Sequence, residues 1–340
     1  MKVLSFKNGV KAMLLLSLFA CKKPIAINQD AAELTGSGKL TASTNSTLIA
    51  NETVSVDFGV TQDTMTYRSS GLLAGMLPTS GYSPPDYLVK PIKARFHRVD
   101  MSYLGPLKWR HDALGMTVIL VLSDDWNDLY GKTVWPGGTT GTDWTLYDTF
   151  LTNEFNQAIG YGYTANRLHF DIWNEAEGKQ FWNPANISST GNGSVAQNEA
   201  NRKRFCETYV HAVTKLKALA AAASKTIYIE GPSLSSIRFQ NTILGDPGPY
   251  VYFSRWLDSA KKFIALPDFL TWHFPGNSNT PGATTPVQEI NDVRGLYTAR
   301  GLGAPQIIIN EFINNNDGKF HANPGKVGWL ISQHERAGIF

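Results

Sequence analysis

The chain has few cysteines, few charges and none of the usual signatures of serine or metal chemistry. Its 340 residues include two cysteines, Cys21 and Cys206, too few for a disulfide framework, and Cys206 lies in a helical pattern that predicts a buried thiol. Charged residues make up 17% of the chain and the formal net charge is +3, which indicates neutral substrates rather than nucleic acid. No Gly-x-Ser-x-Gly elbow is present, and no histidines and carboxylates have metal-ligand spacing. We therefore expect no metal and no cofactor.

The first 21 residues have the layout of a secretory signal. Lys2, Lys7 and Lys11 precede an apolar stretch, 12–20, that is too short to span a membrane as a mature helix. The stretch ends in Leu-Phe-Ala-Cys at Cys21, which resembles the lipobox of bacterial lipoproteins, where the cysteine becomes the lipidated N-terminus. The alternative is an ordinary signal peptide with an incidental cysteine. The resemblance predicts an exported protein anchored by lipid to a bacterial membrane, on a face that the sequence leaves open.

The rest of the chain divides into a linker and one domain after the predicted signal peptide, 1–21. Residues 22–51 are small and polar without a sustained period, which predicts a flexible linker. From 52 to 340, strand-like and helix-like segments alternate, which predicts a parallel α/β domain. The expected strands are Val54–Val60, Ala94–Met101, Thr117–Leu122, Arg167–Trp173, Thr226–Glu230, Asp268–His273 and Gln306–Asn310. The expected helices lie near Leu104–Leu114, Leu146–Ile159, Val195–Ala223, Tyr250–Phe263, Pro286–Arg300 and Lys326–Ala337.

Seven strand–helix units of this length predict a (β/α)8 TIM barrel rather than an open doubly wound sheet. No glycine-rich phosphate loop follows the first predicted strand, as a doubly wound nucleotide-binding sheet would require. Only Gly338, Ile339 and Phe340 follow the last predicted helix. We therefore expect a barrel truncated before its eighth strand, with an open edge between the seventh and first strands.

Two glutamates end apolar, β-branched runs, and an asparagine precedes each of them. The runs are 168–175 and 307–312, and they read as buried parallel strands that carry Glu175 and Glu311 at their carboxyl ends. Burying a carboxylate without a partner is expensive, so a pair of them suggests an active site. In a barrel, catalytic groups lie at this end of the strands. Retaining glycosidases need two such carboxyl groups roughly 5 Å apart.

The residues around the two glutamates carry a family resemblance. Trp173-Asn174-Glu175 after strand four and Asn310-Glu311 after strand seven resemble clan A of the glycoside hydrolases. The resemblance implies that Glu175 is the acid/base and Glu311 the nucleophile of a double displacement. It also implies that Asn174 hydrogen-bonds the sugar 2-hydroxyl, a contact that strengthens in the transition state. Asn310 is implied to bind substrate.

Further fragments are similar to family 39 of that clan, which includes β-xylosidases. Arg95-Phe96-His97 on strand two resembles its Arg-x-His, and Gly231-Pro232-Ser233 resembles its Gly-Pro-Ala/Ser. This resemblance places Arg95 and His97 at the substrate. Arg95 is expected to orient the nucleophile and keep it ionised, and the alternative for Arg95 is a structural ion pair inside the barrel.

Aromatic residues near the predicted strand ends are candidate sugar contacts, because sugars stack on flat apolar rings. We expect substrate binding by Trp126, Trp182, Trp272 and His273. The alternative for His273 is a core histidine. The sequence thus predicts a retaining glycoside hydrolase acting on a β-linked polysaccharide or oligosaccharide. Two alternatives stay open: a non-catalytic carbohydrate-binding barrel, or an inactive fragment of a larger glycosidase.

Overall fold

The structure is a computed structural model that describes much of the chain beyond its N-terminal part. The described residues are 70–77, 83–123, 135–138, 140–177, 181–182, 194–238, 244, 246, 248–274, 284–312 and 324–339. Contacts divide the chain into Met1–Gln62 and Asp63–Phe340, and every described residue belongs to the second unit. The predicted signal peptide with Cys21, the linker and Trp126 lie outside the described residues. No helix among the described residues is long and apolar enough to cross a membrane.

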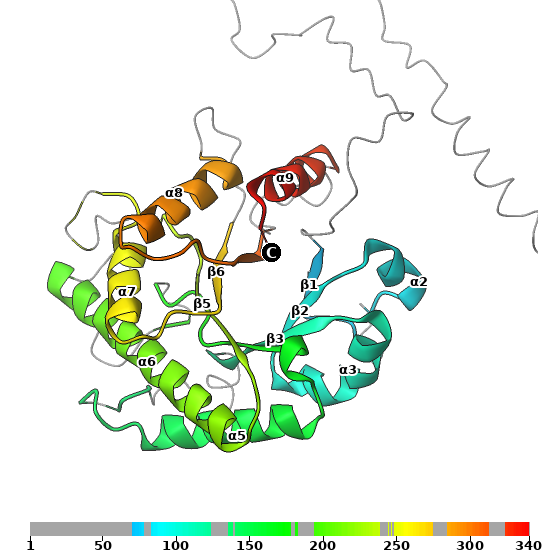
Figure 1. Cartoon of the computed structure of the whole chain (residues 1–340), viewed down its shortest axis with the longest axis horizontal. Coiled ribbons are helices and arrows are strands. Elements are labelled where there is room, and N and C mark those ends of the chain that lie inside the picture. The colour runs from blue at the N-terminus through cyan, green and yellow to red at the C-terminus, as the bar shows by residue number, and fades with distance from the viewer. Residues whose placement is uncertain are drawn as a thin grey trace, which may run out of the picture. The chain divides into compact units, whose positions relative to one another are not determined.

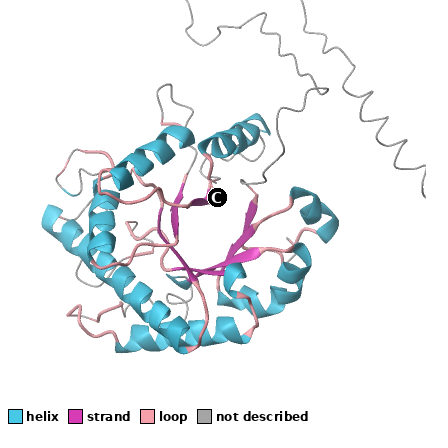
Figure 2. Cartoon of the chain, in the orientation of Figure 1, coloured by secondary structure: helices cyan, strands magenta, loops and turns pink. Residues whose placement is uncertain are grey.

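The second unit is a nearly closed parallel barrel surrounded by helices (Figures 1 and 2). Seven strands among the described residues pair in parallel, in the order in which they occur along the chain. This confirms the predicted α/β barrel without an eighth strand in the described part. The strands are β1 (Gly71–Leu73), β2 (Phe96–Val99), β3 (Thr117–Val121), β4 (Leu168–Asp171), β5 (Tyr228–Leu234), β6 (Phe269–His273) and β7 (Ile307–Glu311).

The helices follow the strands as expected for βα units. Two of them begin at side-chain caps that the sequence shows: Asp100 accepts the Ser102 N–H at the start of α3, and Ser194 and Gln197 form a capping box at the start of α6. Cys206 lies buried on α6, as predicted. The helices are α2 (Asp86–Val89), η2 (Lys90–Ile92), α3 (Met101–Leu114), α5 (Thr145–Gly160), η3 (Ala165–Arg167), α6 (Val195–Ala222), α7 (Val251–Lys262), α8 (Pro286–Thr298) and α9 (Pro324–Ala337).

Side chains that point into the barrel form an apolar layer and a polar layer. They alternate along each strand with side chains that face the helices. The apolar layer lies near the amino ends of the strands, and the polar layer lies near their carboxyl ends. The apolar layer contains Phe96, Ile119, Phe269 and Ile308, with Tyr228 packed against it, and the ring of His169 stacks on Phe269. The polar layer contains Arg98, Asp171, Ser233, Thr271 and Asn310, which are joined by hydrogen bonds.

The barrel is open between β1 and β7. Within the described residues, β1 pairs only with β2, and β7 pairs only with β6. A cavity of about 180 Å³ lies at this opening and extends from the apolar layer to Glu311, with His334 and Ile339 from the C-terminal part lining one side. The predicted open edge between the seventh and first strands is therefore confirmed for the described part of the chain.

The described strand that pairs with the outer side of β2 is one that the sequence did not predict. We expected the first strand at Val54–Val60, which is outside the described residues, whereas the strand that pairs with β2 is Gly71–Leu73, with Gly71 opposite Phe96. Its Gly-Leu-Leu sequence is too short to show a strand pattern. Pairing with β2, rather than local sequence preference, defines it as a strand.

Candidate active site

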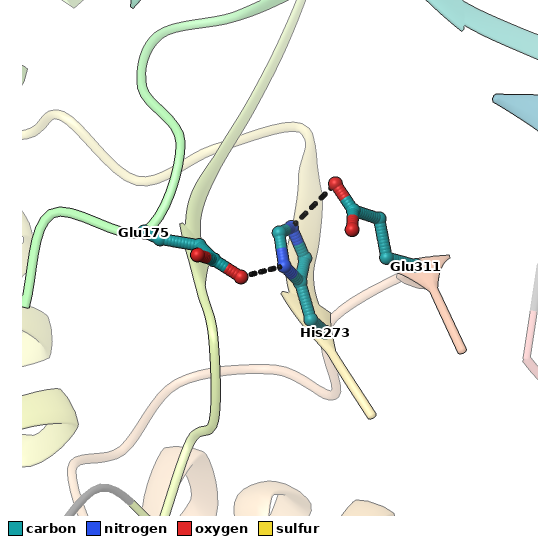
Figure 3. A group of neighbouring side chains, drawn as sticks. All are labelled: Glu175, His273 and Glu311. Carbon is teal, nitrogen blue, oxygen red and sulfur yellow. Dashed lines mark hydrogen bonds and ion pairs between the residues drawn. The ribbon is translucent and has the colours of Figure 1, made fainter. Parts of the chain in front are cut away.

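Glu175, His273 and Glu311 meet at the carboxyl ends of β4, β6 and β7 (Figure 3). The His273 ring lies between the two carboxylates: Nδ1 is 2.8 Å from Glu175 Oε1, and Nε2 is 3.6 Å from Glu311 Oε1. One oxygen of each glutamate and one ring nitrogen of His273 all lie within 4.8 Å of one another. The glutamate side chains are 28% and 29% exposed, so both can be reached from solvent. The structure thus brings together the two glutamates that the sequence singled out.

A buried arginine holds the site from below. Arg98 donates from Nε and Nη2 to Asp171 Oδ2, at 3.0 and 2.8 Å, and from Nη1 to Glu311 Oε1 at 2.6 Å. Its Nη2 also donates to Asn174 Oδ1 at 2.8 Å. Because Asp171 is fully buried, the guanidinium supplies the charge partner that its carboxylate needs. The same group therefore neutralises the core aspartate and orients the carboxylate of Glu311.

Asn174 and Asn310 contact the Arg98–Asp171 ion pair through opposite ends of their side-chain amides. Arginine has donors and no acceptor, so the group of Asn174 that faces Arg98 must be its oxygen, which turns its Nδ2 donors away from Arg98. Asn310 donates from Nδ2 to Asp171 Oδ2 at 3.2 Å and to Ser233 Oγ at 2.9 Å. Asn174 can thus offer a donor to a substrate hydroxyl, whereas the Asn310 amide hydrogens bond within the protein. The Asn310 amide nitrogen therefore belongs to the supporting network, and the substrate contact expected of Asn310 stays a prediction.

Ser233, on β5, completes the network beneath the glutamates. Its hydroxyl donates to Asp171 Oδ1 at 2.6 Å, so its oxygen accepts from the Thr271 hydroxyl at 2.7 Å and from Asn310. Side chains from β2, β4, β5, β6 and β7 are thereby joined at one level of the barrel. These hydrogen bonds between neighbouring strands give a rigid floor for the carboxylates above them.

Glu175 itself has an unusual backbone conformation. Its φ is 47°, in the left-handed region that residues with a Cβ rarely adopt. Its N–H donates to the carbonyl oxygen of Ser233 at 2.8 Å, which ties the residue to the end of β5. Such backbone conformations persist where the surroundings over-determine them, and they are common at functional sites.

Arg95 and His97 do not lie at this site, which corrects their predicted role. Arg95 immediately precedes β2 at its amino end, with its guanidinium 5.6 Å from the centre of the Phe96 ring. His97 points away from the barrel interior, where its Nε2 donates to the Ala74 carbonyl and its Nδ1 pairs with His111 Nε2 at 2.8 Å. Burial lowers the pKa of His97 to about 4, so the ring is neutral at pH 7 and acts as a core hydrogen-bonding group.

Two of the predicted aromatic contacts are buried in the core instead. Trp182 packs edge to face against Trp173, with ring centres 4.9 Å apart, and against Trp135 at 5.3 Å. Trp272 is fully buried and donates from its indole nitrogen to Glu289 on α8 at 2.6 Å. Because alternate side chains of a strand face opposite sides, Trp272 faces α8 while its neighbour His273 reaches the barrel mouth.

The residues that sequence reasoning missed are Arg98, Asp171 and Ser233. The rule that functional groups lie at carboxyl ends of barrel strands points to Arg98 rather than Arg95, because the two arginines occupy opposite ends of β2. Asp171 also indicated in the sequence that an arginine or lysine must lie inside the barrel. A carboxylate inside a buried strand requires a cationic partner, and the matching interior position two strands away is Arg98.

Glu175, His273 and Glu311 form a group that could hold a metal ion among the described residues. One feature opposes coordination. Arg98 donates to the Glu311 oxygen that would face the ion, and a cation at 2.6 Å opposes the approach of another.

No protein-family model matches the chain, and no curated protein matches it. Among solved structures, N2152 from Neocallimastix frontalis is similar with a TM-score of 0.54 and 18% sequence identity, over 80% of this chain and 59% of that one. The chain thus spans 59% of the length of N2152. The 3-keto-D-glucoside 4-epimerase YcjR from E. coli has a TM-score of 0.37 and 10% identity, over 77% of this chain and 98% of that one. The first likeness concerns the fold, and the second is too distant to inform the chemistry. A barrel with paired carboxylates at its mouth is compatible with carbohydrate chemistry.

Proposed function

We propose that the protein is a retaining glycoside hydrolase that cleaves β-linked polysaccharides or oligosaccharides. The observation that carries the proposal is the spacing of the two strand-end glutamates, whose nearest carboxylate oxygens lie within 4.8 Å. Retaining enzymes place their carboxyl groups roughly 5–5.5 Å apart, whereas inverting enzymes leave roughly 6.5–9.5 Å for a water molecule. The short spacing supports direct attack by one carboxylate on the sugar.

The surroundings of the two glutamates support separate roles. Arg98 donates to Glu311 Oε1 at 2.6 Å and so fixes the orientation of this carboxylate, which suits a nucleophile. Glu175 has no arginine or lysine partner among the described residues and contacts His273 instead. We assign Glu311 as the nucleophile and Glu175 as the acid/base.

The proposed reaction has two displacement steps. In the first, a Glu311 oxygen attacks the anomeric carbon, the glycosidic bond breaks, and Glu175 gives its proton to the leaving oxygen. In the second, Glu175 takes a proton from water as that water attacks the anomeric carbon and releases Glu311. The Nδ2 donor of Asn174 faces away from Arg98 and is available to the sugar 2-hydroxyl, a contact that strengthens as positive charge develops on the ring.

The assignment is tested by hydrolysis and by the stereochemistry of the product. The wild-type chain is assayed on a panel of β-linked glycans and aryl β-glycosides, with the product anomer followed by NMR. We expect release with retention, and loss of roughly 10⁴-fold or more in Glu311→Ala. Glu207→Ala, on the outer face of α6, is a carboxylate control that should keep full activity. A product of inverted configuration would contradict the proposal.

Azide rescue distinguishes the two glutamates. With an activated aryl β-glycoside, Glu175→Ala should still form the glycosyl-enzyme, which azide then attacks to give a β-glycosyl azide. Glu311→Ala has no nucleophile, so azide attacks the sugar directly and gives the α-glycosyl azide. The opposite pattern would exchange the two roles.

The alternative is a carbohydrate-binding barrel without turnover. The opening between β1 and β7 favours it, because Glu311 lies on a strand with one partner in the described part of the chain. Calorimetric titration with the same glycans decides between the two. Binding without hydrolysis by the wild type supports the alternative, whereas hydrolysis that Glu311→Ala abolishes with binding intact supports the enzyme.

We also propose that Cys21 is lipidated and anchors the exported protein to a bacterial membrane. The motif that ends at Cys21 supports this assignment. Incorporation of labelled palmitate into the wild type but not into Cys21→Ala, with Cys206→Ala as the control, would support it. Equal labelling of the wild type and Cys21→Ala would contradict it.

A further inference from the structure

We propose that Glu177 is a positioning residue for Glu175, holding the loop that carries the acid/base against the end of β5. The inference rests on the proposed function, because it concerns how Glu175 is presented to a substrate. Glu177 lies two residues after Glu175, is 4% exposed, and belongs to neither glutamate motif found in the sequence.

The contacts of Glu177 join two neighbouring strand ends. Its Oε1 accepts from the Ser235 hydroxyl at 2.7 Å and from the Ser236 N–H at 3.2 Å. Two residues earlier on both segments, the Glu175 N–H donates to the Ser233 carbonyl at 2.8 Å. The loop after β4 is therefore fastened to β5 on both sides of the Glu175 side chain, once through the backbone and once through Glu177.

The conformation of Glu175 explains why a second fastening is needed. A left-handed conformation is unfavourable for a residue with a Cβ, so the loop would relax if its contacts were removed. Relaxation at Glu175 moves its carboxylate away from His273, which it contacts at 2.8 Å. A misplacement of about 1 Å at a reacting group can cost about a hundredfold in rate. Glu177 thus acts on the chemistry through the position of Glu175.

Glu177 is ionisable as well as buried, so its contribution to holding the loop depends on pH. Burial is the main cause that raises its pKa to about 7, and the charge of Glu175 acts in the same direction. Among the described residues, Tyr252 of α7 also interacts with Glu177, and burial raises the pKa of this tyrosine well above its ordinary value, so that the phenol stays neutral. The carboxylate of Glu177 therefore gains charge near neutral pH beside the acid/base loop.

Hydrogen exchange tests the fastening without any substrate. The exchange of backbone amides in segment 173–177 is followed in the wild type, Glu177→Ala, Glu177→Gln and the control Glu154→Gln, which changes a buried glutamate on α5. We expect roughly tenfold faster exchange in Glu177→Ala and near wild-type protection in Glu177→Gln, since the amide oxygen still accepts from Ser235 and Ser236. Wild-type protection of this segment in Glu177→Ala would overturn the proposal.

Leaving-group dependence tests the catalytic consequence. Acid assistance matters for a poor leaving group and little for an activated one, so Glu177→Ala should lose about tenfold more in kcat/KM on an alkyl β-glycoside than on a dinitrophenyl β-glycoside. Glu177→Gln should restore most of this loss and remove a transition near pH 7 from the pH profile. Equal losses on both substrates would reduce Glu177 to a general stability role and overturn the inference. If the wild type hydrolyses neither substrate, the proposed function fails, and the exchange experiment still decides whether Glu177 holds the loop.

Discussion

Glu175 and Glu311 follow similar sequence patterns, yet the protein holds them in different ways. Glu175 comes after β4, which is paired on one side with β3 and on the other with β5. Glu311 ends β7, which within the described residues is paired on one side, with β6. The β4 end is held by backbone and by the buried Glu177. The β7 end is held by one backbone bond, from the Phe274 N–H to the Glu311 carbonyl, and by the side chain of Arg98.

This difference shows that a similar strand-end motif does not determine which contacts hold its glutamate in place. At β4, neighbouring strands fix the loop, and a strained backbone at Glu175 can be tolerated. At β7, an edge strand offers less backbone support, and a cation orients the carboxylate. Arg98 also contacts Asn174, so the two ends are coupled through one guanidinium.

The largest effect is expected from removing that shared guanidinium. Arg98→Met leaves Asp171 buried without its charge partner, which should lower the free energy of unfolding by about 3–5 kcal/mol in urea denaturation. Arg95→Met is the matched control on the other end of β2 and should cost less than about 1 kcal/mol. The double variant Arg98→Met/Asp171→Asn should recover part of the loss. An equal decrease in the free energy of unfolding for Arg98→Met and Arg95→Met would show that Arg98 has no special role in holding the β7 end.

The next largest effect is a pH-dependent change in folding stability that arises from Glu177 at the β4 end. The pKa of Glu177 is raised from 4.5 to about 7 in the folded protein, so the stability associated with its neutral form is present below pH 4.5 and lost as the pH rises through 7. Glu177→Gln removes this loss, so its stability relative to the wild type should rise between pH 4.5 and 8, by ~3 kcal/mol at most. Thermal denaturation over this pH range measures the change. A constant difference between the two proteins would contradict the prediction.

The two asparagines should separate catalysis from support. Asn174→Ala removes the donor available to the sugar 2-hydroxyl and should lower kcat/KM by about 100-fold, with a much smaller loss on a 2-deoxy substrate. Asn310→Ala removes hydrogen bonds to Asp171 and Ser233 and should cost about 1–2 kcal/mol of folding stability. Kinetics on paired substrates and urea denaturation give the two values. Similar kinetic losses in both variants would show that the asparagines do not differ in role.

The smallest effect is a difference in local opening between the two strands. Part of the N–H groups of an edge strand point away from its partner, so amides of β7 should exchange with solvent roughly tenfold faster than those of β4. Hydrogen exchange followed by NMR or mass spectrometry measures both strands in one sample. Equal protection would show that the second edge of β7 is covered.

The order of elements could be predicted because it rests on local patterns. β3, with the sequence Thr-Val-Ile-Leu-Val, and the long helix α6 are visible from composition and periodicity alone. β1 was not predicted correctly, because three residues carry no period and pairing with β2 defines the strand. The burial of Trp182 and Trp272 could not be predicted either, because local sequence does not say whether an aromatic ring near a strand end faces the barrel mouth or the helices.

The two glutamates could be found because a carboxylate after a buried strand is rare enough to stand out. Their neighbours could not be found in the same way. Arg95 and Arg98 lie only three positions apart in the sequence, and choosing between them requires knowing where β2 begins and ends. Ser233 belongs to a fragment with a family resemblance, but its contact with Asp171 and that of Glu177 with Ser235 are visible only once β5 is placed beside β4.

By itself, the sequence determined the parallel strand–helix order and the two Asn-Glu strand ends, because both depend on residues close together in the chain. The tertiary structure decided which arginine reaches Glu311, that His273 lies between the glutamates, and that Glu177 meets Ser235 and Ser236. These contacts join residues up to 213 positions apart. They depend on how the strands are arranged around the barrel, which local sequence preference does not encode.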